Sequence, residues 1–241
     1  MNDKIKDYYN IQFHHLKSGP LDKMKKEVRF ALLKKLLQFQ KENVLIIGCG
    51  SQGEMGILNK NCKGLGVDLS ETAIKQTKRD YPKFKYYVCD ATNLPMKDNQ
   101  FDCVVCSEVM EHIPNQQKLL KEIKRVLKRK GLLLLTTPNW LSWYGLARII
   151  AEFIFKKPFT ADNQPVDNWQ IPYRLKRILE KDFKIVLFQG LWYYPPTGKG
   201  RFRIPDLMVL PLFWLFYPIE LLLRKILPWF GHMMVFKASL K

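Results

Sequence analysis

Acidic residues are scarce in this 241-residue chain, which has 22 Asp and Glu against 40 Lys and Arg and a formal net charge of +18. Such a surface attracts anions of every kind, including nucleic acids, anionic lipid headgroups and acidic metabolites. The net charge therefore indicates an anionic partner but does not identify which anion. Seven of the thirteen residues at 118–130 are basic, and a solvated helix face explains that run equally well.

The chain also lacks an apolar run long enough to cross a bilayer. Residues 207–219 are thirteen consecutive residues without a charge, whereas a spanning helix needs about 20. Prolines in and after this run are expected to break or bend a helix, and charges interrupt any extension: Pro211, Pro218, Pro228, Glu220, Arg224 and Lys225. We therefore expect no transmembrane segment.

Cysteine is limited to five residues, an odd number, and no secretory signal precedes them. These features favour reduced thiols and a cytoplasmic location. Cys103 and Cys106 form a C-x-x-C pair, but they fall in a strand-like run in which such positions point to opposite faces. Metal binding or redox pairing by these two cysteines is therefore not expected. Internal repeats and low-complexity tracts are also absent.

Helical and strand patterns alternate through the first 138 residues. Residues 21–40 place apolar side chains at helical spacing between lysines, which indicates an amphipathic helix. Further helices are expected after Ser70 and over residues 116–128. Strands are expected at residues 44–47, 64–67, 84–88, 101–106 and 132–136. This alternation indicates parallel βαβ units and a doubly wound, Rossmann-like α/β fold.

The pattern changes after Pro138. An apolar helix is expected at residues 143–155, then a polar loop, a helix at 172–181, and strands from 183 toward 192 and at 232–240. These last strands complete a mostly parallel, seven-stranded sheet. We interpret residues 1–241 as one domain. It carries a helical N-terminal leader and two apolar, helical insertions expected to act as lids: residues 1–42, 141–170 and 201–230.

The stretch VLIIGCGSQG at residues 44–53 is typical of a buried strand that turns into a nucleotide-binding helix. The third glycine, Gly53, and the apolar Ile46 favour a dinucleotide. Asp68 ends the next strand, eighteen residues after Gly50. A carboxylate there can accept both hydrogen bonds of an adenosine ribose, which suits a dinucleotide and S-adenosylmethionine alike. These residues leave both cofactors open.

The next block, CDATNLPMKDNQFDCVVCSEVMEHI at residues 89–113, separates the two cofactors. It resembles the class I S-adenosylmethionine-dependent methyltransferases, especially the small-molecule branch that includes the ubiquinone-biosynthesis O-methyltransferases. The resemblance is strong over residues 40–140 and implies that Asp90 accepts a hydrogen bond from the adenine amino group. The residues expected to bind this cofactor are Gly48, Cys49, Gly50, Ser51, Gly53, Asp68, Leu69, Asp90, Ala91 and Ser107.

Two positions depart from the family pattern. The acid that the family has in the first strand, which helps to hold the methionine amino group, is Ile46 here. The usual third glycine is Gln52, with Gly53 one place later. The methionine end of the cofactor is therefore held differently from the adenosine end, and Glu54 is one candidate for the ammonium contact.

Methyl transfer from a sulfonium mainly requires that the acceptor, the methyl group and the sulfur be held in line. An oxygen or nitrogen acceptor also needs a base, and we expect His112 to take its proton. If residues 108–112 are helical, Glu108, Glu111 and His112 share one face. The resemblance to metal-dependent quinone methyltransferases implies the alternative that these three side chains hold a divalent cation.

The acceptor is expected to be hydrophobic, such as a prenylated quinone, another isoprenoid or a lipid. In the family, segments after the fourth and fifth strands and near the last strand pair cover the acceptor, and both insertions here are apolar. Residues 204–230, preceded by Arg201 and Arg203, suit a peripheral contact with a membrane. An RNA methyltransferase and an inactive, membrane-associated scaffold are the alternatives. A nucleic-acid acceptor is not favoured, because no Asn-Pro-Pro-Tyr type clamp or Pro-Cys pair is present.

Overall fold

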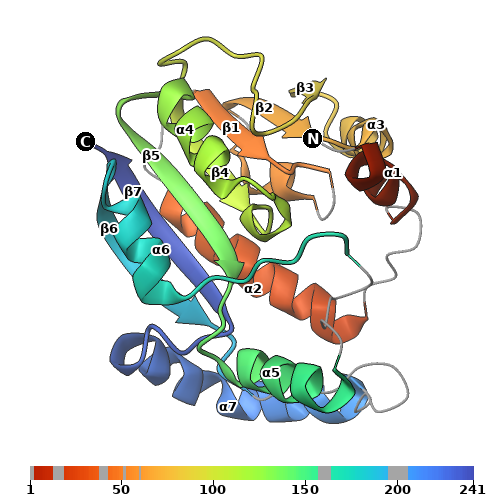
Figure 1. Ribbon diagram of the computed structural model, residues 1–241, viewed down its shortest axis with the longest axis vertical. Helices are drawn as coiled ribbons and strands as arrows, with labels where there is room; N and C mark the ends of the chain where they lie inside the picture. The colour runs from red at the N-terminus through yellow and green to blue at the C-terminus, as the bar shows by residue number, and fades with distance from the viewer. Residues whose placement is uncertain are drawn as a thin grey trace.

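A seven-stranded sheet with helices on both faces forms the molecule (Figure 1). The computed structural model describes residues 3–12, 19–37, 43–50, 53–59, 61–156, 164–194 and 206–241. The strands are β1 Asn43–Ile47, β2 Lys63–Asp68, β3 Lys85–Val88, β4 Phe101–Ser107, β5 Leu127–Pro138, β6 Phe183–Leu191 and β7 Met233–Leu240. The helices are α1 Asp3–Gln12, α2 Pro20–Leu37, α3 Glu71–Asp80, α4 Gln116–Val126, α5 Trp143–Phe155, α6 Pro172–Leu179 and α7 Asp206–Ile226, with 3-10 turns η1 Glu54–Ile57 and η2 Met110–His112.

The strand order is β3-β2-β1-β4-β5-β7-β6. The first five strands are parallel, and β7 runs antiparallel to both β5 and β6. This order confirms the doubly wound α/β fold and the mostly parallel, seven-stranded sheet. In a sheet of this kind, ligands bind beyond the carboxyl ends of the parallel strands, where the strand order reverses. Here that point lies between β1 and β4.

Alternate residues of the central strands pack into two apolar clusters on opposite faces of the sheet. Leu45 and Ile47 belong to the cluster that includes residues of α4 and α6, whereas Val44 and Ile46 belong to the cluster formed with α2 and α3. Cys103 and Cys106 divide in the same way. The structure thus confirms that the two cysteines of the C-x-x-C pair face opposite sides, and all five thiols are free.

The helices lie where the sequence predicts them, but α4 and α6 end earlier than expected, α6 at Leu179 and not at residue 181. Ser70 caps α3 as predicted, since its Oγ accepts a hydrogen bond from the N–H of Ala73 at 3.2 Å. The predicted extension of α4 to residue 128 is wrong, because Leu127 already pairs with Phe101 as the first residue of β5. Leu127 is fully buried beside the start of β4. This burial favours the strand conformation at residue 127 over a further turn of α4.

Part of the basic run at residues 118–130 pairs with acids of the same chain. The guanidinium of Arg125 bonds to Glu122 and Asp98 at 2.7–2.9 Å. Lys128 Nζ lies 2.9 Å from Asp102 Oδ1. This pairing supports the structural interpretation of these two cations over a role as a site for an anionic partner.

Helix α7 runs through both Pro211 and Pro218, so of the two outcomes expected at these prolines, a break or a bend, the break does not occur. Each proline removes one backbone hydrogen bond, but both are exposed, so water can bond the freed carbonyls. Glu220, on the buried side of α7, accepts a hydrogen bond from the N–H of Trp192 at 3.1 Å and pairs with Arg224. Among the described helices, none combines the length and the apolar character that crossing a bilayer requires.

Candidate active site

The glycine-rich turn after β1 contains approaches that only glycine permits. Gly48 has a φ of +73°, and a Cβ atom there would lie 2.2 Å from Cγ2 of Val109. A Cβ atom at Gly50 would lie 2.4 Å from the Cβ of Ala73 in the first turn of α3. The turn therefore fits tightly between α3 and the segment that follows β4, as a nucleotide-binding turn must.

The turn also contains three other residues that the sequence analysis expects to bind the cofactor: Cys49, Ser51 and Gly53. Cys49 directs its thiol into the core, where burial raises its pKa above the usual value. Its N–H donates to the carbonyl of Val67, and its carbonyl accepts from the hydroxyl of Thr77. Gly53 has a φ of +83° and precedes η1. Ser51 and the neighbouring Gln52 lie outside the described residues.

Asp68 joins the glycine-rich turn to the start of α3. Its Oδ2 accepts a hydrogen bond from the N–H of Gly50 at 3.0 Å, and its Oδ1 accepts one from the N–H of Ser70 at 2.9 Å. Burial raises the pKa of Asp68, and backbone hydrogen bonds, including one from Leu69, offset this only in part. Each carboxylate oxygen has a second lone pair, so Asp68 can still accept hydrogen bonds from a ribose.

Asp90 lies at the carboxyl end of the strand next to Asp68. The N–H of Cys89 donates to the carbonyl oxygen of Asp68 at 2.9 Å, so the two acids occupy neighbouring strand ends. Burial would raise the pKa of Asp90, but hydrogen bonds, including two from Thr92 at 2.8 Å, hold it below the usual value. Ala91 is buried beside it. The two carboxylates that the sequence analysis expects to bind the ribose and the adenine thus lie side by side.

The segment after β4 is not α-helical, so the expectation that Glu108, Glu111 and His112 share a helix face is wrong. Glu108 has a φ of +56°, a conformation in which non-glycine residues are strained. Only η2, a single 3-10 turn, follows it. Ser107 is buried before this bend, with its Oγ 3.0 Å from Oγ1 of Thr136. After this bend Glu108 faces Arg29, whereas Glu111 and His112 stay close to each other, with Oε1 and Nε2 3.8 Å apart.

The carboxylate of Glu108 meets a buried arginine that the sequence analysis did not single out. Arg29 of α2 lies 3.8 Å from Glu108 and 3.4 Å from Glu54, between the segments that follow β4 and β1. Burial raises the pKa of both Glu108 and Glu111 to about 8. Glu54, one candidate for the cofactor ammonium, is therefore buried with Arg29 as its counter-ion. Arg29 lies on the same face of α2 as the buried Leu33 and Leu37. A charged residue on this apolar face was the feature of the sequence that could have indicated a buried ion pair.

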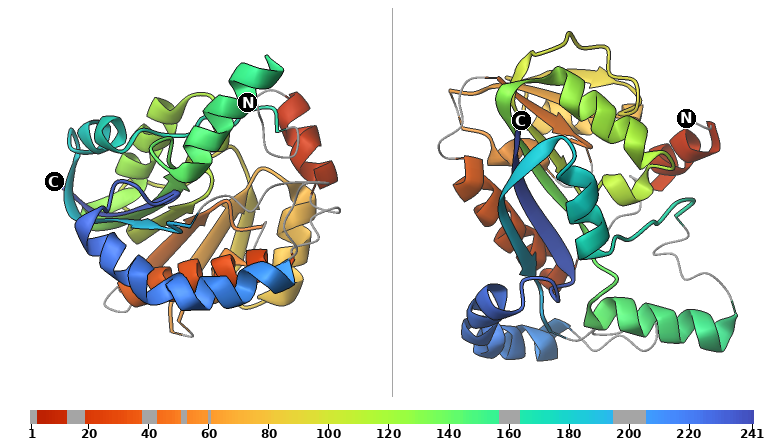
Figure 2. Two further views of the ribbon diagram at one scale, coloured as in Figure 1. Left: turned by 90° about the horizontal axis from the view of Figure 1, so that it is seen from below. Right: turned by 60° about the vertical axis from the view of Figure 1, so that its left-hand side comes forward.

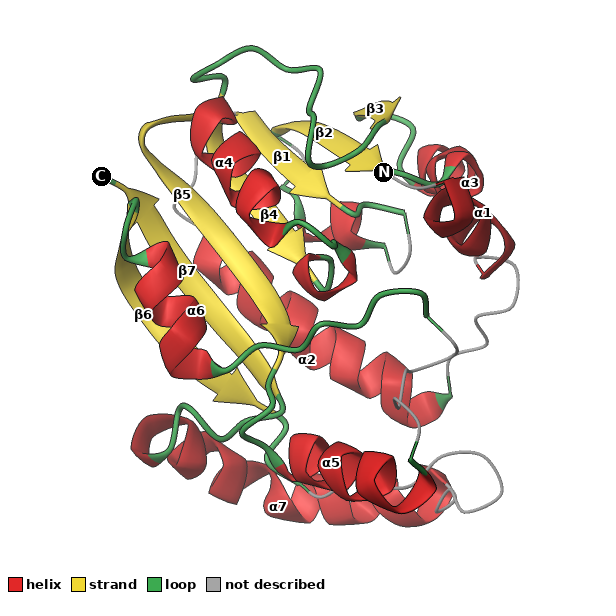
Figure 3. Ribbon diagram, in the orientation of Figure 1, coloured by secondary structure: helices red, strands yellow, loops and turns green. Residues whose placement is uncertain are grey.

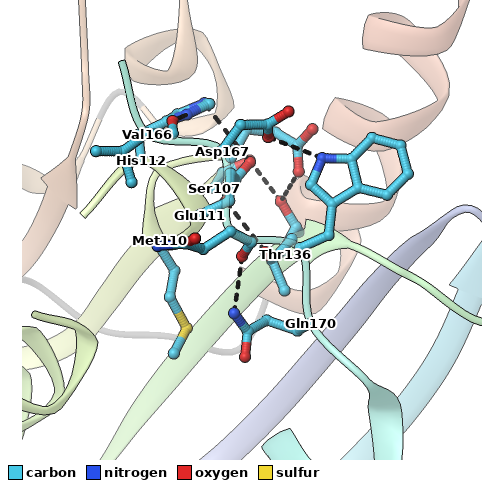
Figure 4. Close-up of polar contacts among 12 residues, drawn as sticks. Ser107, Met110, Glu111, His112, Thr136, Val166, Asp167 and Gln170 are labelled. Carbon is cyan, nitrogen blue, oxygen red and sulfur yellow. Dashed lines mark hydrogen bonds and ion pairs between the residues drawn. The ribbon is translucent and has the colours of Figure 1, made fainter. Parts of the chain in front are cut away.

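His112 is oriented by the segment that connects α5 to α6. Its Nδ1 lies 3.2 Å from the carbonyl oxygen of Val166 (Figure 4). The same segment crosses the sheet as a loop (Figure 3), and the N–H of Asn168 donates to the carbonyl of Glu111. A carbonyl only accepts, so Nδ1 carries the proton and Nε2 keeps its lone pair in the neutral ring. Nε2 lies 3.8 Å from Oε1 of Glu111.

The three side chains do not form a metal site. Glu108 faces Arg29 and Thr136, and Glu111 accepts a hydrogen bond from the hydroxyl of Thr137 at 3.1 Å. Within the described ranges, no group of three or more His, Cys, Asp or Glu side chains is arranged to bind a metal ion. The residues present therefore do not fit the divalent cation considered as an alternative.

The raised pKa of Glu111 makes stability depend on pH. Folded Glu111 keeps its proton up to about pH 8, while the unfolded chain loses it near 4.5, so the free energy of unfolding falls as pH rises between these values. We expect Glu111→Gln, which cannot ionise, to reduce the loss between pH 6 and 8.5 by about 1–2 kcal/mol. Urea unfolding at both pH values measures this, with Asp80→Asn, an exposed acid, as the control. Equal pH dependence in the wild type and Glu111→Gln would contradict the assignment.

Proteins of similar sequence match different shares of this chain. An uncharacterized protein of Methanocaldococcus jannaschii is 33% identical over 179 residues, covering 72% of this chain and 77% of that protein. A Mycobacterium tuberculosis protein named a probable S-adenosylmethionine-dependent methyltransferase is 33% identical over 102 residues, covering 42% of this chain and 37% of that protein. A ubiquinone biosynthesis O-methyltransferase of Bartonella quintana is 27% identical over 185 residues, covering 72% of each chain.

The fold is also that of solved methyltransferases. The crystal structure of an S-adenosylmethionine-dependent methyltransferase from Archaeoglobus fulgidus matches with a TM-score of 0.59 at 23% identity, covering 88% of this chain and 93% of that one. A family model described as a methyltransferase domain matches residues 45–135, which include the glycine-rich turn, both acids and His112. The chain therefore belongs to the S-adenosylmethionine-dependent methyltransferases, with S-adenosylmethionine as its cofactor.

Proposed function

We propose that this methyltransferase acts on a hydrophobic acceptor, such as a prenylated quinone, another isoprenoid or a lipid, at the surface of a membrane. The observation that carries the proposal is the exposed apolar surface of α5 and α7. Both helices lie at the end of the molecule where β5 ends (Figure 2). The large apolar side chains exposed on them are Trp143, Leu146, Ile149, Ile150, Phe153, Ile154, Phe155, Met208, Trp214, Leu215, Phe216, Ile219, Leu221, Leu222 and Ile226.

Exposed apolar patches of this kind mark interaction surfaces in soluble domains. Phe153 is 84% exposed and Leu215 is 69% exposed, although each belongs to a regular helix. The exposed Lys156 and Lys225 end the two helices, and the chain carries a net charge of +18. Apolar side chains flanked by cations favour the interface of an anionic bilayer. Arg201 and Arg203, also expected to contribute, lie outside the described residues.

Helix α5 is connected to the residues around His112. Arg148 of α5 is buried between the rings of Trp140 and Trp169, and its Nη1 lies 2.9 Å from Oδ2 of Asp167. Asp167 follows Val166, whose carbonyl oxygen bonds to His112. An acceptor that arrives along α5 is therefore brought to the end of the sheet where His112 lies.

In the proposed reaction, the protein holds both substrates and removes a proton. Asp68 and Asp90 bind the ribose and the adenine, and the turn at Gly48 and Gly50 leaves room for the cofactor. When bound, S-adenosylmethionine supplies a methyl group on a positively charged sulfur. The cofactor would supply the methyl group to the acceptor oxygen and keep the electron pair of the broken carbon–sulfur bond on its sulfur, while Nε2 of His112 would take the acceptor proton. The ubiquinone biosynthesis relatives support an oxygen acceptor.

Sedimentation with vesicles of anionic phospholipid tests the membrane contact. We expect Phe153→Glu in α5 and Leu215→Glu in α7 each to lower the partition coefficient about tenfold, because burying one large apolar side chain stabilises by about 1.5–3 kcal/mol. The control is Val186→Glu, since Val186 is 57% exposed on β6, away from both helices. Equal sedimentation of all three variants with the wild type would exclude α5 and α7 as the contact surface.

A further inference from the structure

Neither of the two positions considered for an acidic contact with the amino-acid end of the cofactor supplies one. Ile46 stands where the family has an acid, and its side chain is fully buried in the cluster formed with α2 and α3. Glu54 is also buried, and Arg29 is its counter-ion at 3.4 Å. Neither side chain is therefore available to hold the methionine ammonium group.

Helix α1 lies next to the cofactor residues, although the sequence analysis treated it only as part of a leader. The Oγ of Ser70 donates to Oδ1 of Asn10 at 2.8 Å, and Lys6 pairs with Glu71 at 3.0 Å. Ser70 is also the residue whose N–H bonds to Asp68. These contacts hold α1 over the start of α3, beside the carboxylate that we assign to the ribose.

Tyr9 projects from α1 toward η2. The centroid of its ring lies 5.9 Å from that of His112. Its hydroxyl oxygen is buried, and no described residue forms a hydrogen bond with it. Burial raises the pKa of Tyr9 above the usual value, and the charges of Glu111, Asp167 and Asp68 contribute. The hydroxyl is therefore within electrostatic reach of both Asp68 and the loop around His112.

A buried hydroxyl without a partner costs free energy, so such groups usually have a ligand or a function. We propose that Tyr9 binds the amino-acid end of S-adenosylmethionine, with its hydroxyl oxygen accepting a hydrogen bond from the cofactor ammonium group. The carboxylates of Asp68 and Asp167 favour a cation at this position over an anion. Tyr9 thus accepts the hydrogen bond from the ammonium group that the side chain of Ile46, which has no polar atom, cannot accept. In this arrangement α1 covers the bound cofactor.

Calorimetry with two probes of the cofactor site tests this inference independently of the methyl acceptor. S-Adenosylhomocysteine carries the amino-acid end, whereas 5′-methylthioadenosine has the same adenosine and sulfur without it. We expect Tyr9→Phe to raise the Kd for S-adenosylhomocysteine about tenfold or more, as expected for a lost hydrogen bond to a charged group. The Kd for 5′-methylthioadenosine should change less than twofold.

Two controls separate this contact from a loss of folding. Tyr8→Phe, next to Tyr9 on the same helix, should leave the Kd for both probes within twofold. The Tm of ligand-free Tyr9→Phe should equal or exceed that of the wild type, because the hydroxyl removed has no partner. A lower Tm, an equal loss for both probes, or unchanged binding of S-adenosylhomocysteine would each overturn the inference.

Discussion

Replacing His112 by Asn is expected to lower kcat/KM about 100-fold or more, since a positioned general base contributes roughly 10²–10⁴-fold. Asn retains an N–H that can donate to the carbonyl of Val166, as Nδ1 of His112 does, but it has no lone pair in place of Nε2. The assay measures methyl transfer to a prenylated quinol with a free hydroxyl group, presented in mixed micelles.

The Kd for S-adenosylhomocysteine and the Tm of His112→Asn should stay close to the wild-type values, because the ring is assigned to the acceptor side of the site. Full activity of this variant would place the base elsewhere. Glu108 is then the next residue to replace, since about a fifth of its side chain is exposed beside Thr136. A loss of cofactor binding equal to the loss of activity would also contradict a role confined to proton transfer.

Replacing Asp68 by Asn is expected to raise the Kd for S-adenosylhomocysteine about 100-fold or more. The substitution removes the charge that strengthens hydrogen bonds from the ribose. It also directs an amide NH₂ at either Gly50 or Ser70, whose N–H groups now donate to the carboxylate. Both effects weaken the same site, and hydrogen bonds to charged groups are worth roughly 1.5–3 kcal/mol each.

Titration calorimetry measures this effect, and Asp80→Asn is the matched control. Asp80 is an exposed acid at the other end of α3, so the same change of charge there should leave the Kd within twofold. If Asp68→Asn binds S-adenosylhomocysteine within threefold of the wild type, the carboxylate serves the turn and not the ribose.

The fold and the cofactor residues were predictable because their signals are local. Strand β1, the turn at Gly48 and the acid Asp68 follow one another within 25 residues, and Ser70 is a helix cap at the expected place. The block from Asp90 to His112 carried the family resemblance. The errors lie where long-range packing overrides local pattern, as when Leu127 pairs with Phe101 and ends α4 early.

The site around His112 was only partly predictable. The spacing of Glu108, Glu111 and His112 suggested one helix face, but Glu108 has a positive φ and its side chain faces Arg29. The buried Arg29 was overlooked because it belongs to a helix interpreted only by its apolar spacing. The residues around Tyr9 form a short polar segment, and nothing in that segment indicates a contact with the cofactor.

By itself, the sequence determined the doubly wound α/β fold, the family and the two acids at neighbouring strand ends, because apolar period, glycine spacing and strand-end acids lie within short segments. Only the tertiary structure decided that Arg29 lies between Glu54 and Glu108, that Val166 orients His112 from 54 residues away, and that α1 places the ring of Tyr9 beside that of His112. Contacts between distant segments depend on how the sheet and its helices pack, and no local pattern encodes them.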